Sequence, residues 1–354
     1  MIWNNPVTQL LKIKYPFIQA PMLGVTTPEM VAAAADEHIL GSLPLGLTSV
    51  KKASQSIAAV KKLTSAAFSV NLFIYAKKAF PAQPNLSTLK LYYGNNNLPF
   101  PDIPKEDPYT SFEELIDVII NEQIPVVSFT FGIPAKNVVD KLKNNGVILI
   151  GVATSAEEAK QIQENGLDLV VAQGIEAGGH RGSFANQKLP EIGLMALLPQ
   201  VIDAVDIPVI GAGGLSQGKS IAAAFVLGAQ GVQIGSAFLR SKESAASAIH
   251  KSLLNSINDT GTIITNAWTG RFARLIPNDF TENFPLEELL PYPYQNYMTS
   301  SIRQFGKEQN RSDIQALYAG QSAKYAKDEP VAEIIRNLIS EAEDALLRPC
   351  QAFE

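Results

Sequence analysis

An apolar run passes directly into a glycine-rich loop in one stretch of the chain, Val170-Val171-Ala172-Gln173-Gly174-Ile175-Glu176-Ala177-Gly178-Gly179-His180-Arg181-Gly182-Ser183-Phe184. The apolar residues 169–172 predict a strand that is covered on both faces. The four glycines after it allow backbone N–H groups to approach an anion closely, so a phosphate group is the ligand we expect. His180 follows two of these glycines, and its imidazole brings acid–base chemistry beside that ligand. A surface turn with an incidental histidine is the alternative.

The composition is that of a folded protein with a large core. The chain has 354 residues, of which 46% are hydrophobic and 18% are charged, and these proportions are typical of globular domains. The 34 acidic residues outnumber the 29 basic ones, which gives a formal net charge of −5. This balance disfavours a general nucleic-acid binder and a membrane-surface binder. A small anionic ligand would need a local positive site.

Cysteine usage and the N-terminal sequence bear on the cellular compartment. Cys350 is the only cysteine, so the sequence predicts neither an intrachain disulfide nor a cysteine metal cluster, and no metal site is expected. Residues 1–16 lack the long apolar segment of a secretory signal, and no apolar run elsewhere has membrane-spanning length. We therefore expect a cytoplasmic protein.

Eight short apolar runs recur between residues 16 and 239, and most are followed by an amphipathic stretch. The intervening helices have recognisable ends, such as the cap and first-turn glutamates of 154–158 and the stop at Asn165-Gly166. This alternation predicts an α/β fold, and eight repeats predict a TIM (β/α)8 barrel. An open doubly wound sheet is the competing architecture. The predicted strands are residues 17–20, 39–45, 68–72, 126–129, 147–152, 169–172, 208–211 and 231–234.

Two segments depart from this alternation. Residues from about 75 to 110 are rich in proline and asparagine and have no sustained period, which predicts a long inserted loop. In a barrel such a loop leaves the C-terminal face and covers or shapes the site; a passive surface excursion is the alternative. After residue 240 the parallel-strand pattern stops. We predict a barrel over residues 1–240 and a mostly helical lobe covering the active site over 241–354, with an extended piece at 262–265 and helices at 244–257, 300–306, 313–318 and 331–347.

Glycine-rich or polar clusters follow three of the late strands. They lie at 173–182, at 211–215 and at 235–236. Because the carboxyl ends of parallel barrel strands meet on one face, we expect the three clusters to converge. Backbone amides after late barrel strands are a recurring phosphate site of this fold. The sequence therefore predicts a phosphorylated ligand or cofactor.

In these sequence motifs the chain resembles the nitronate monooxygenase family, formerly called 2-nitropropane dioxygenases, in its bacterial class I form. The resemblance implies a TIM barrel that binds FMN non-covalently and oxidises alkyl nitronates with molecular oxygen, with propionate 3-nitronate as the expected substrate and detoxification as the role. It extends over nearly the whole chain. The residues that carry it are Gln19-Ala20-Pro21-Met22, Gly24, Phe129-Thr130-Phe131-Gly132, 174–184, Gly213-Gly214, Gln233-Ile234-Gly235-Ser236, Thr269-Gly270-Arg271 and Tyr318-Ala319-Gly320-Gln321-Ser322.

The resemblance also implies which residues bind FMN. Glycine amides and the Ser236 hydroxyl would donate to the phosphate. Side-chain amides suit the ribityl hydroxyls or the edge of the flavin ring, and Met22 could pack on the ring, although a barrel-core position is its alternative role. The expected cofactor residues are Met22, Asn71, Gln173, Gly178, Gly179, Gly213, Gly214, Gln233, Gly235 and Ser236.

His180 matches the histidine that this family places over the flavin, and it is the predicted catalytic residue. It would act as a base on a neutral nitroalkane, or as a stabiliser of a nitronate that is already an anion. Substrate contacts are expected from Tyr292, Tyr294 or Tyr297, and Arg181, Arg303 and Lys307 are further candidates. His38 stands where the family usually has a glycine, and His250 is interpreted as solvated.

Two other functions remain open from the sequence. An FMN-dependent enoyl-(acyl carrier protein) reductase, which uses a nicotinamide coenzyme, shares the barrel and the Gly-Gly-His loop. A flavin-binding protein without turnover would also use the glycine clusters, although it would not need His180. The stretch 176–184 and the long C-terminal lobe favour the monooxygenase, with a nitronate and O₂ as partners; the sequence does not indicate an oligomeric state.

Overall fold

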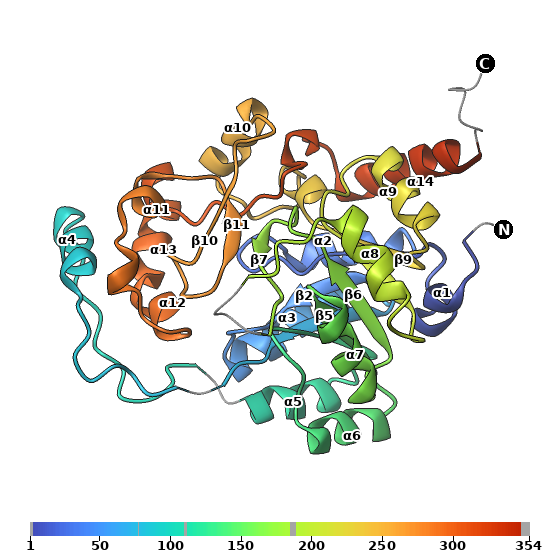
Figure 1. Cartoon of the computed structure of the whole chain (residues 1–354), viewed down its shortest axis with the longest axis horizontal. Helices are drawn as coiled ribbons and strands as arrows, with labels where there is room; N and C mark the ends of the chain where they lie inside the picture. Colours follow the sequence, from blue (N-terminus) through green and yellow to red (C-terminus); the bar gives the residue numbers. More distant parts are fainter. Residues whose placement is uncertain (1–2, 77, 110–111, 185–188, 348–354) are drawn as a thin grey trace.

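The centre of the molecule is a barrel of eight parallel strands (Figure 1). The computed structural model describes residues 3–76, 78–109, 112–184 and 189–347. Backbone hydrogen bonds from Gln19 N to the Leu40 carbonyl and from Leu40 N to the Phe17 carbonyl close the barrel between its first and second strands. The predicted TIM barrel is therefore confirmed. Its strands are β1 (Phe17–Gln19), β2 (Gly41–Pro44), β3 (Phe68–Phe73), β4 (Val126–Thr130), β5 (Ile148–Ala153), β6 (Leu169–Gln173), β8 (Val209–Ala212) and β9 (Gly231–Ile234).

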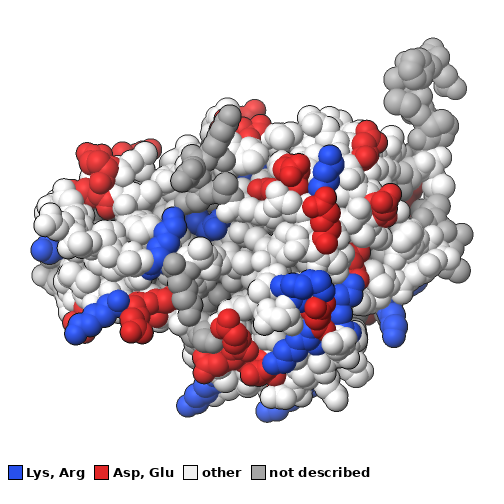
Figure 2. All heavy atoms as spheres, turned by 60° about the horizontal axis from the view of Figure 1, so that its bottom comes forward, with Lys and Arg blue, Asp and Glu red and all other residues white. Residues whose placement is uncertain are grey.

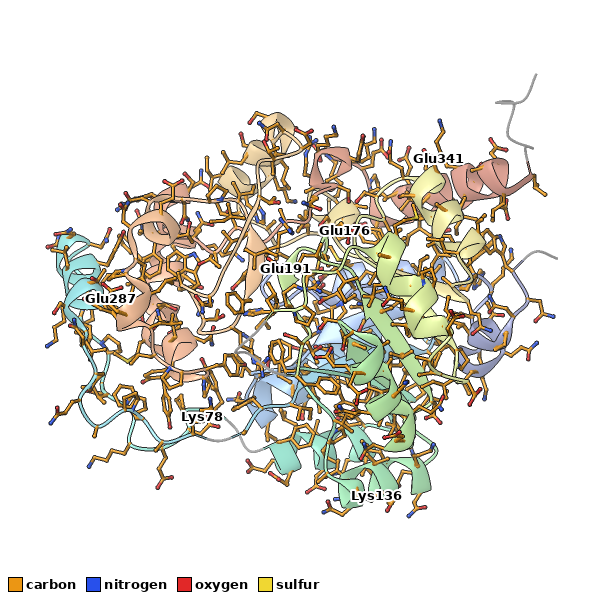
Figure 3. All side chains as sticks on the ribbon, viewed as in Figure 1. Lys78, Lys136, Glu176, Glu191, Glu287 and Glu341 are labelled. Carbon is orange, nitrogen blue, oxygen red and sulfur yellow. The ribbon has the colours of Figure 1, made fainter. Side chains whose placement is uncertain are left out.

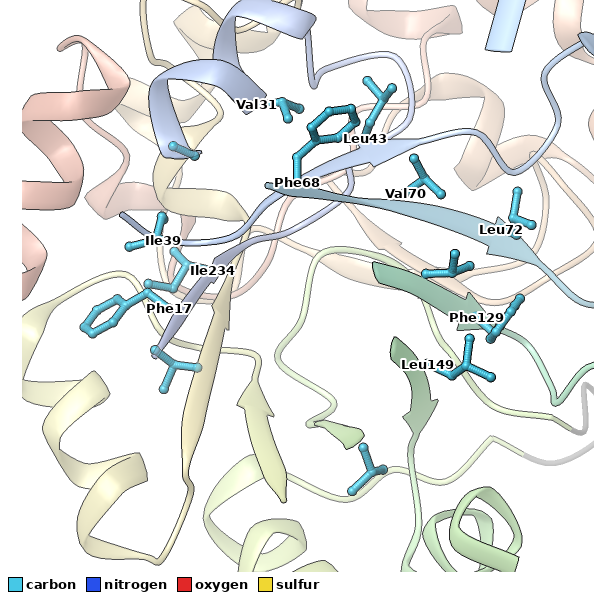
Figure 4. Packing of buried hydrophobic residues seen from close by; sticks show 14 of the residues in the cluster. Phe17, Val31, Ile39, Leu43, Phe68, Val70, Leu72, Phe129, Leu149 and Ile234 are labelled. Carbon is cyan, nitrogen blue, oxygen red and sulfur yellow. The ribbon is translucent and has the colours of Figure 1, made fainter. Parts of the chain in front are cut away.

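The strands form a barrel because they are apolar on both faces. In β6, Leu169 and Val171 pack inside the barrel, whereas Val170 and Ala172 pack outward against the helices. Alternate side chains of the strand point to opposite faces of the sheet, and both faces are buried. Parallel strands covered by helices require this pattern. Figure 4 shows part of the outer cluster, in which Phe17, Phe68 and Phe129 lie between the strands and the helices.

Eight helices surround the barrel, and the last of them comes from the end of the chain. Helix α14 packs against α9 and α2, and its apolar side chains belong to the same core cluster as the strands. Residues 331–347 thus lie beyond the predicted division at residue 240 but pack as part of the barrel. The short helix α1 (Pro6–Leu11) precedes β1. The surrounding helices are α2 (Pro28–Asp36), α3 (Val50–Leu63), α5 (Phe112–Asn121), α6 (Lys136–Asn144), α7 (Ala156–Glu164), α8 (Leu194–Ile202), α9 (Gly218–Val226) and α14 (Val331–Leu347).

Residues after β9 build a second lobe on the C-terminal side of the barrel. Its core is centred on Trp268, which stacks on Phe280 at a centroid distance of 3.7 Å. A three-stranded antiparallel sheet joins it to the barrel loops, because β11 pairs with β10 and with the two-residue strand β7 (Gly179–His180). The lobe's other elements are α10 (Ala248–Ser256), β10 (Ile263–Thr265), β11 (Ala273–Leu275), α11 (Asp279–Asn283), α12 (Tyr294–Met298) and α13 (Ser300–Glu308).

The helix predicted at 313–318 is wrong. Only a single 3-10 turn forms there, at Ser312–Ile314, and Tyr318 forms an antiparallel bridge with Leu275. The segment is mostly extended, and its apolar side chains pack into the lobe. Tertiary packing therefore overrides the local helical pattern.

The insertion after β3 is also more ordered than its sequence indicates. It contains helix α4 (Ser87–Asn95), in which Leu89 and Tyr93 are buried in the core of the second lobe. The hydroxyl of Tyr93 donates a hydrogen bond to the Met298 carbonyl at 2.8 Å. In Figure 1 this helix lies at the far left beside α11 and α13. The prediction of a loop without structure is wrong for α4, because its stability comes from the lobe rather than from its own periodicity; residues 77 and 110 lie outside the described part.

The outer surface carries interspersed charges. Figure 2 shows basic and acidic side chains side by side on the face it presents, and one such pair, Lys141 and Asp117, joins α6 to α5 at 2.6 Å. Within the described ranges, no helix is long and apolar enough to cross a membrane.

Candidate functional site

A cavity of about 310 Å³ opens at the carboxyl ends of the barrel strands, under the second lobe. Side chains or backbone from the ends of β1, β3, β4, β6, β8 and β9 line it, so the predicted convergence of the strand ends is confirmed. His180 and all the residues predicted to bind the cofactor lie in its wall: Met22, Asn71, Gln173, Gly178, Gly179, Gly213, Gly214, Gln233, Gly235 and Ser236.

One end of the cavity is lined with unpaired backbone donors. Gly213 and Gly214 have φ angles of +110° and +73°, a conformation that other residues rarely adopt. The amides of Gly213, Gly214, Gly235 and Ser236 make no hydrogen bond within the described ranges. Because these four donors have no partner among the described residues and line one cavity, they are suited to an anionic ligand, and a phosphate group fits them.

A segment of the second lobe crosses this end of the cavity. The amide of Gly320 donates to the Ser236 hydroxyl at 2.9 Å, and the amide of Gln321 donates to the Glu176 carbonyl at 3.0 Å. The contact is close, because a Cβ atom on Gly178 would lie 2.5 Å from the Gly320 nitrogen. Glu176, labelled in Figure 3, also accepts the Leu194 amide at the start of α8. Gly178 is therefore required here by the closeness of two backbones.

The side-chain amides in the cavity differ in how many partners they have. Asn71 Nδ2 donates to the hydroxyls of Ser128 and Thr130, at 2.9 and 3.0 Å. Gln173 is occupied by its own loop, since its Nε2 donates to the His180 carbonyl at 3.1 Å and its Oε1 accepts the Gly182 amide at 2.8 Å. Gln233 makes no side-chain hydrogen bond within the described chain. Gln173 thus shapes the loop, while Gln233 remains available to a ligand.

Three buried arginines hold the loop that carries His180. Arg181, only 1% exposed, donates to the carbonyls of Gln173 and Gly174. Arg274 donates to the Ile175 carbonyl at 2.9 Å, and Arg271 donates to the Ser183 carbonyl at 3.0 Å. Charged donors form stronger hydrogen bonds than neutral ones, so both ends of the loop are fixed.

His180 lies between the loop and the lobe. Its strand β7 pairs with β11, and its Nε2 lies 2.9 Å from Thr269 Oγ1. The rings of Phe131 and Tyr318 contact it at centroid distances of 5.7 and 5.3 Å. Burial, together with the positive charges of Arg271 and Arg303, lowers the pKa of His180 to about 3. The imidazole is therefore neutral at physiological pH.

Two cations and two tyrosine hydroxyls lie near His180; Arg303, Tyr292 and Tyr318 line the cavity, whereas Arg271 lies behind its wall. Arg271 lies over the Phe131 ring, with its Cζ 4.0 Å from the ring centroid. Arg303 is held by Asn296, whose side-chain and backbone oxygens each accept Nη2 at 2.8 Å. The hydroxyls of Tyr292 and Tyr318 are buried and have no hydrogen-bond partner among the described residues. Burial raises the pKa of both tyrosines, so both hydroxyls remain protonated donors suited to an anion.

Comparison with known proteins agrees with this geometry. The model of the nitronate monooxygenase family matches residues 4–341. The chain belongs to the nitronate monooxygenase family. A probable nitronate monooxygenase of Staphylococcus saprophyticus is 40% identical over 353 residues, covering 98% of this chain and 99% of the relative.

Solved structures from two other organisms resemble the chain over almost its full length. Nitroalkane oxidase from Streptomyces ansochromogenes is 34% identical, with a TM-score of 0.86, covering 96% of this chain and 99% of that one. FabK from Thermotoga maritima is 27% identical, with a TM-score of 0.77, covering 97% of each chain. The family resemblance noted from the sequence is therefore confirmed, and this member is an oxidoreductase.

The structure separates the three tyrosines predicted to contact substrate. Tyr292 lines the cavity. Tyr294 is buried in the lobe, where its hydroxyl donates to the Lys78 carbonyl at 2.7 Å, and Tyr297 packs partly buried against the lobe core; neither belongs to the cavity wall. The peptide bond between Tyr292 and Pro293 is cis. The spacing of the three tyrosines in the sequence does not indicate which ring faces the cavity.

Several charged or titratable residues also differ from expectation. Arg303 lines the cavity, whereas Lys307 donates to the Gly24 carbonyl at 3.2 Å outside the wall. Arg181 points inward and not to solvent. The interpretation of His250 as solvated is wrong, because it is 4% exposed and burial lowers its pKa to about 4. Leu254 of the same helix packs with Ala319 and Ala323, so this face of the helix is buried although its neighbours in the sequence are polar.

Sequence reasoning assigned no role to Thr269, Tyr318 or Asn296. Thr269 and Tyr318 lie within motifs that carry the family resemblance, and that is the only signal the sequence offers for them. No feature of the sequence marks Asn296 as a residue of the site. This residue lies in α12 and lines the cavity, and the position of this short helix depends on packing against the lobe core.

Proposed function

We propose that this protein is an FMN-dependent enzyme that oxidises alkyl nitronates with molecular oxygen and so removes them as toxic compounds. The observation that carries the proposal is one cavity in a nitronate monooxygenase family member. Backbone amides without a partner among the described residues line it, together with His180, Arg303 and the tyrosines Tyr292 and Tyr318, whose hydroxyls likewise have no partner there. A phosphorylated cofactor and a small anion fit this pairing of groups.

The residues present suit FMN. The amides of Gly213, Gly214, Gly235 and Ser236 would hold its phosphate, and Gln233 offers a free side-chain amide for the polar parts of the molecule. These donors need no charged side chain, since backbone amides bind phosphate well when they point toward it. Bound FMN would supply the electron-transfer chemistry with the substrate and with oxygen.

The substrate end suits an organic anion. The hydroxyls of Tyr292 and Tyr318 and the free donors of Arg303 can bind negatively charged oxygens within a low-dielectric cavity, where such contacts are strong. A nitronate has one anionic head, and propionate 3-nitronate has a carboxylate as well. Arg303 in the cavity wall, with Arg271 behind it adding positive charge, supports a substrate with both groups.

Spectroscopy and oxygen consumption test the proposal. We expect the purified protein to be yellow, and heat to release FMN and not FAD. Under anaerobic conditions propionate 3-nitronate should reduce the bound flavin, NADH should leave it oxidised, and in air the nitronate should consume oxygen. Release of FAD, or a colourless protein after incubation with FMN, contradicts the cofactor assignment. Rapid bleaching by NADH followed by reduction of an enoyl thioester would assign the protein to the reductases instead.

A further inference from the structure

The only side-chain hydrogen bond that His180 makes within the described residues is the one to Thr269. His180 Nε2 and Thr269 Oγ1 are 2.9 Å apart, and Thr269 is 1% exposed. The other ring nitrogen, Nδ1, makes no hydrogen bond to the described residues, and the ring lines the cavity. A neutral imidazole carries one proton, so the direction of the hydrogen bond at Thr269 decides which nitrogen has a lone pair for a ligand.

The backbone of Arg271 sets that direction. Its amide donates to Thr269 Oγ1 at 3.3 Å, and its carbonyl accepts the Thr269 hydroxyl at 3.1 Å. A carbonyl can only accept, and that of Arg271, in a residue 7% exposed, accepts no other hydrogen bond in the described chain. If the hydroxyl proton turned toward His180, this buried carbonyl would be left unpaired. The cost lowers the population of that hydroxyl orientation on the order of ten to a hundredfold. The hydroxyl therefore donates to Arg271 and accepts from His180.

We propose that Thr269 is a positioning residue that fixes His180 as the neutral tautomer with its proton on Nε2, so that the lone pair on Nδ1 faces the cavity. The lowered pKa of His180 supports a neutral ring, because burial and the charges of Arg271 and Arg303 disfavour a second proton. The catalytic consequence rests on the proposed function, whereas the tautomer does not.

This tautomer determines which step His180 can assist. Nδ1 can accept the α-proton of a neutral nitroalkane: the C–H bond breaks, its electron pair stays on the nitronate formed, and the proton moves to Nδ1. The same nitrogen cannot donate a hydrogen bond to a nitronate that arrives as an anion. That contact is left to the hydroxyls of Tyr292 and Tyr318 and to Arg303. Thr269 therefore matters for a neutral nitroalkane and much less for a preformed nitronate.

Nitrogen NMR of the protein as purified tests the tautomer directly. The chain has three histidines, so ¹⁵N-histidine labelling gives few signals, and His180→Gln identifies those of His180. We expect a pyridine-type shift at Nδ1 and a pyrrole-type shift at Nε2 in the parent and in Thr269→Ser. Thr269→Val, which removes the hydroxyl at similar volume, should move both shifts toward the other tautomer. The reverse pattern in the parent, a protonated ring, or an unchanged pattern in Thr269→Val overturns the proposal.

Kinetics with two substrates separate positioning from general support. In Thr269→Val we expect kcat/KM to fall about tenfold or more for a neutral nitroalkane and less than about threefold for preformed nitronate, with recovery in Thr269→Ser. Thr265→Val is the matched control, because Thr265 lies in β10 and its hydroxyl accepts only the Ala267 amide; both activities should be unchanged. Equal losses with both substrates, or no recovery with serine, contradict the role. If the parent oxidises neither substrate, the proposed function fails while NMR still decides the tautomer.

Discussion

At the scale of single residues, the proposed function assigns cofactor binding and chemistry to different groups in the cavity. The unpaired donors of Gly213, Gly214, Gly235 and Ser236 are backbone amides, so they do not depend on any side chain. His180 contributes a ring that is held by Thr269 and contacts no other polar group among the described residues. Loss of that ring should therefore affect turnover without removing the cofactor.

We expect His180→Gln to retain FMN and to lose turnover of a neutral nitroalkane by about 10²-fold or more, because a positioned base typically contributes that much, with a smaller loss for preformed nitronate. Flavin absorbance per protein measures the first part, and oxygen consumption with nitroalkane and with nitronate measures the second. His38→Gln is the control, since His38 is exposed and lies outside the cavity wall. A variant that turns over as fast as the parent would exclude His180 from the mechanism.

At the scale of elements, the insertion after β3 supports the substrate end of the cavity. The hydroxyl of Tyr109 accepts a hydrogen bond from Asn296 Nδ2, and Asn296 in turn holds the Arg303 guanidinium. Tyr75 packs edge-on against Tyr292 at a centroid distance of 5.0 Å. The insertion thus orients cavity residues without lining the cavity itself.

Removal of the hydrogen bond between Tyr109 and Asn296, which supports Arg303, should weaken substrate binding. In Tyr109→Phe we expect KM for propionate 3-nitronate to rise about threefold to tenfold with kcat nearly unchanged, which corresponds to one hydrogen bond worth about 0.5–1.5 kcal/mol. Tyr92→Phe is the control, because Tyr92 lies on the same insertion and its hydroxyl contacts Asp279 at the surface. A fall in kcat with KM unchanged would show that the link affects chemistry and not binding.

How much the sequence could predict differs between elements for a physical reason. The barrel strands are buried on both faces, so each carries its own apolar signal, and all eight were predictable. Strands β7 and β11 are two and three residues long and depend on pairing between distant segments, because β7 pairs with β11 and β11 also pairs with β10. Helix α4 likewise depends on the lobe for its burial. The glycine clusters of the sequence indicated part of the cavity wall, whereas Thr269 and Asn296 reach the site through non-local contacts.

At the scale of the whole molecule, two histidines that are neutral in the native protein, the half-buried His180 and the buried His250, make stability depend on pH. Burial lowers the pKa of His180 to about 3 and that of His250 to about 4, against about 6.5 for histidine in the unfolded chain. Below pH 6.5 the unfolded chain therefore binds protons that the native protein does not. The free energy of unfolding should be steady above pH 7 and should fall as the pH drops toward these native values.

Between pH 7 and pH 5 each of the two histidines should lower the free energy of unfolding by about 1–2 kcal/mol. Urea unfolding at the two pH values measures the total change. In His250→Gln the change should be smaller by one histidine's share, because glutamine does not titrate. His38→Gln is the control, since His38 is exposed and its removal should leave the change as in the parent. If His250→Gln shows the same pH dependence as the parent, His250 is not the buried neutral group that its surroundings indicate.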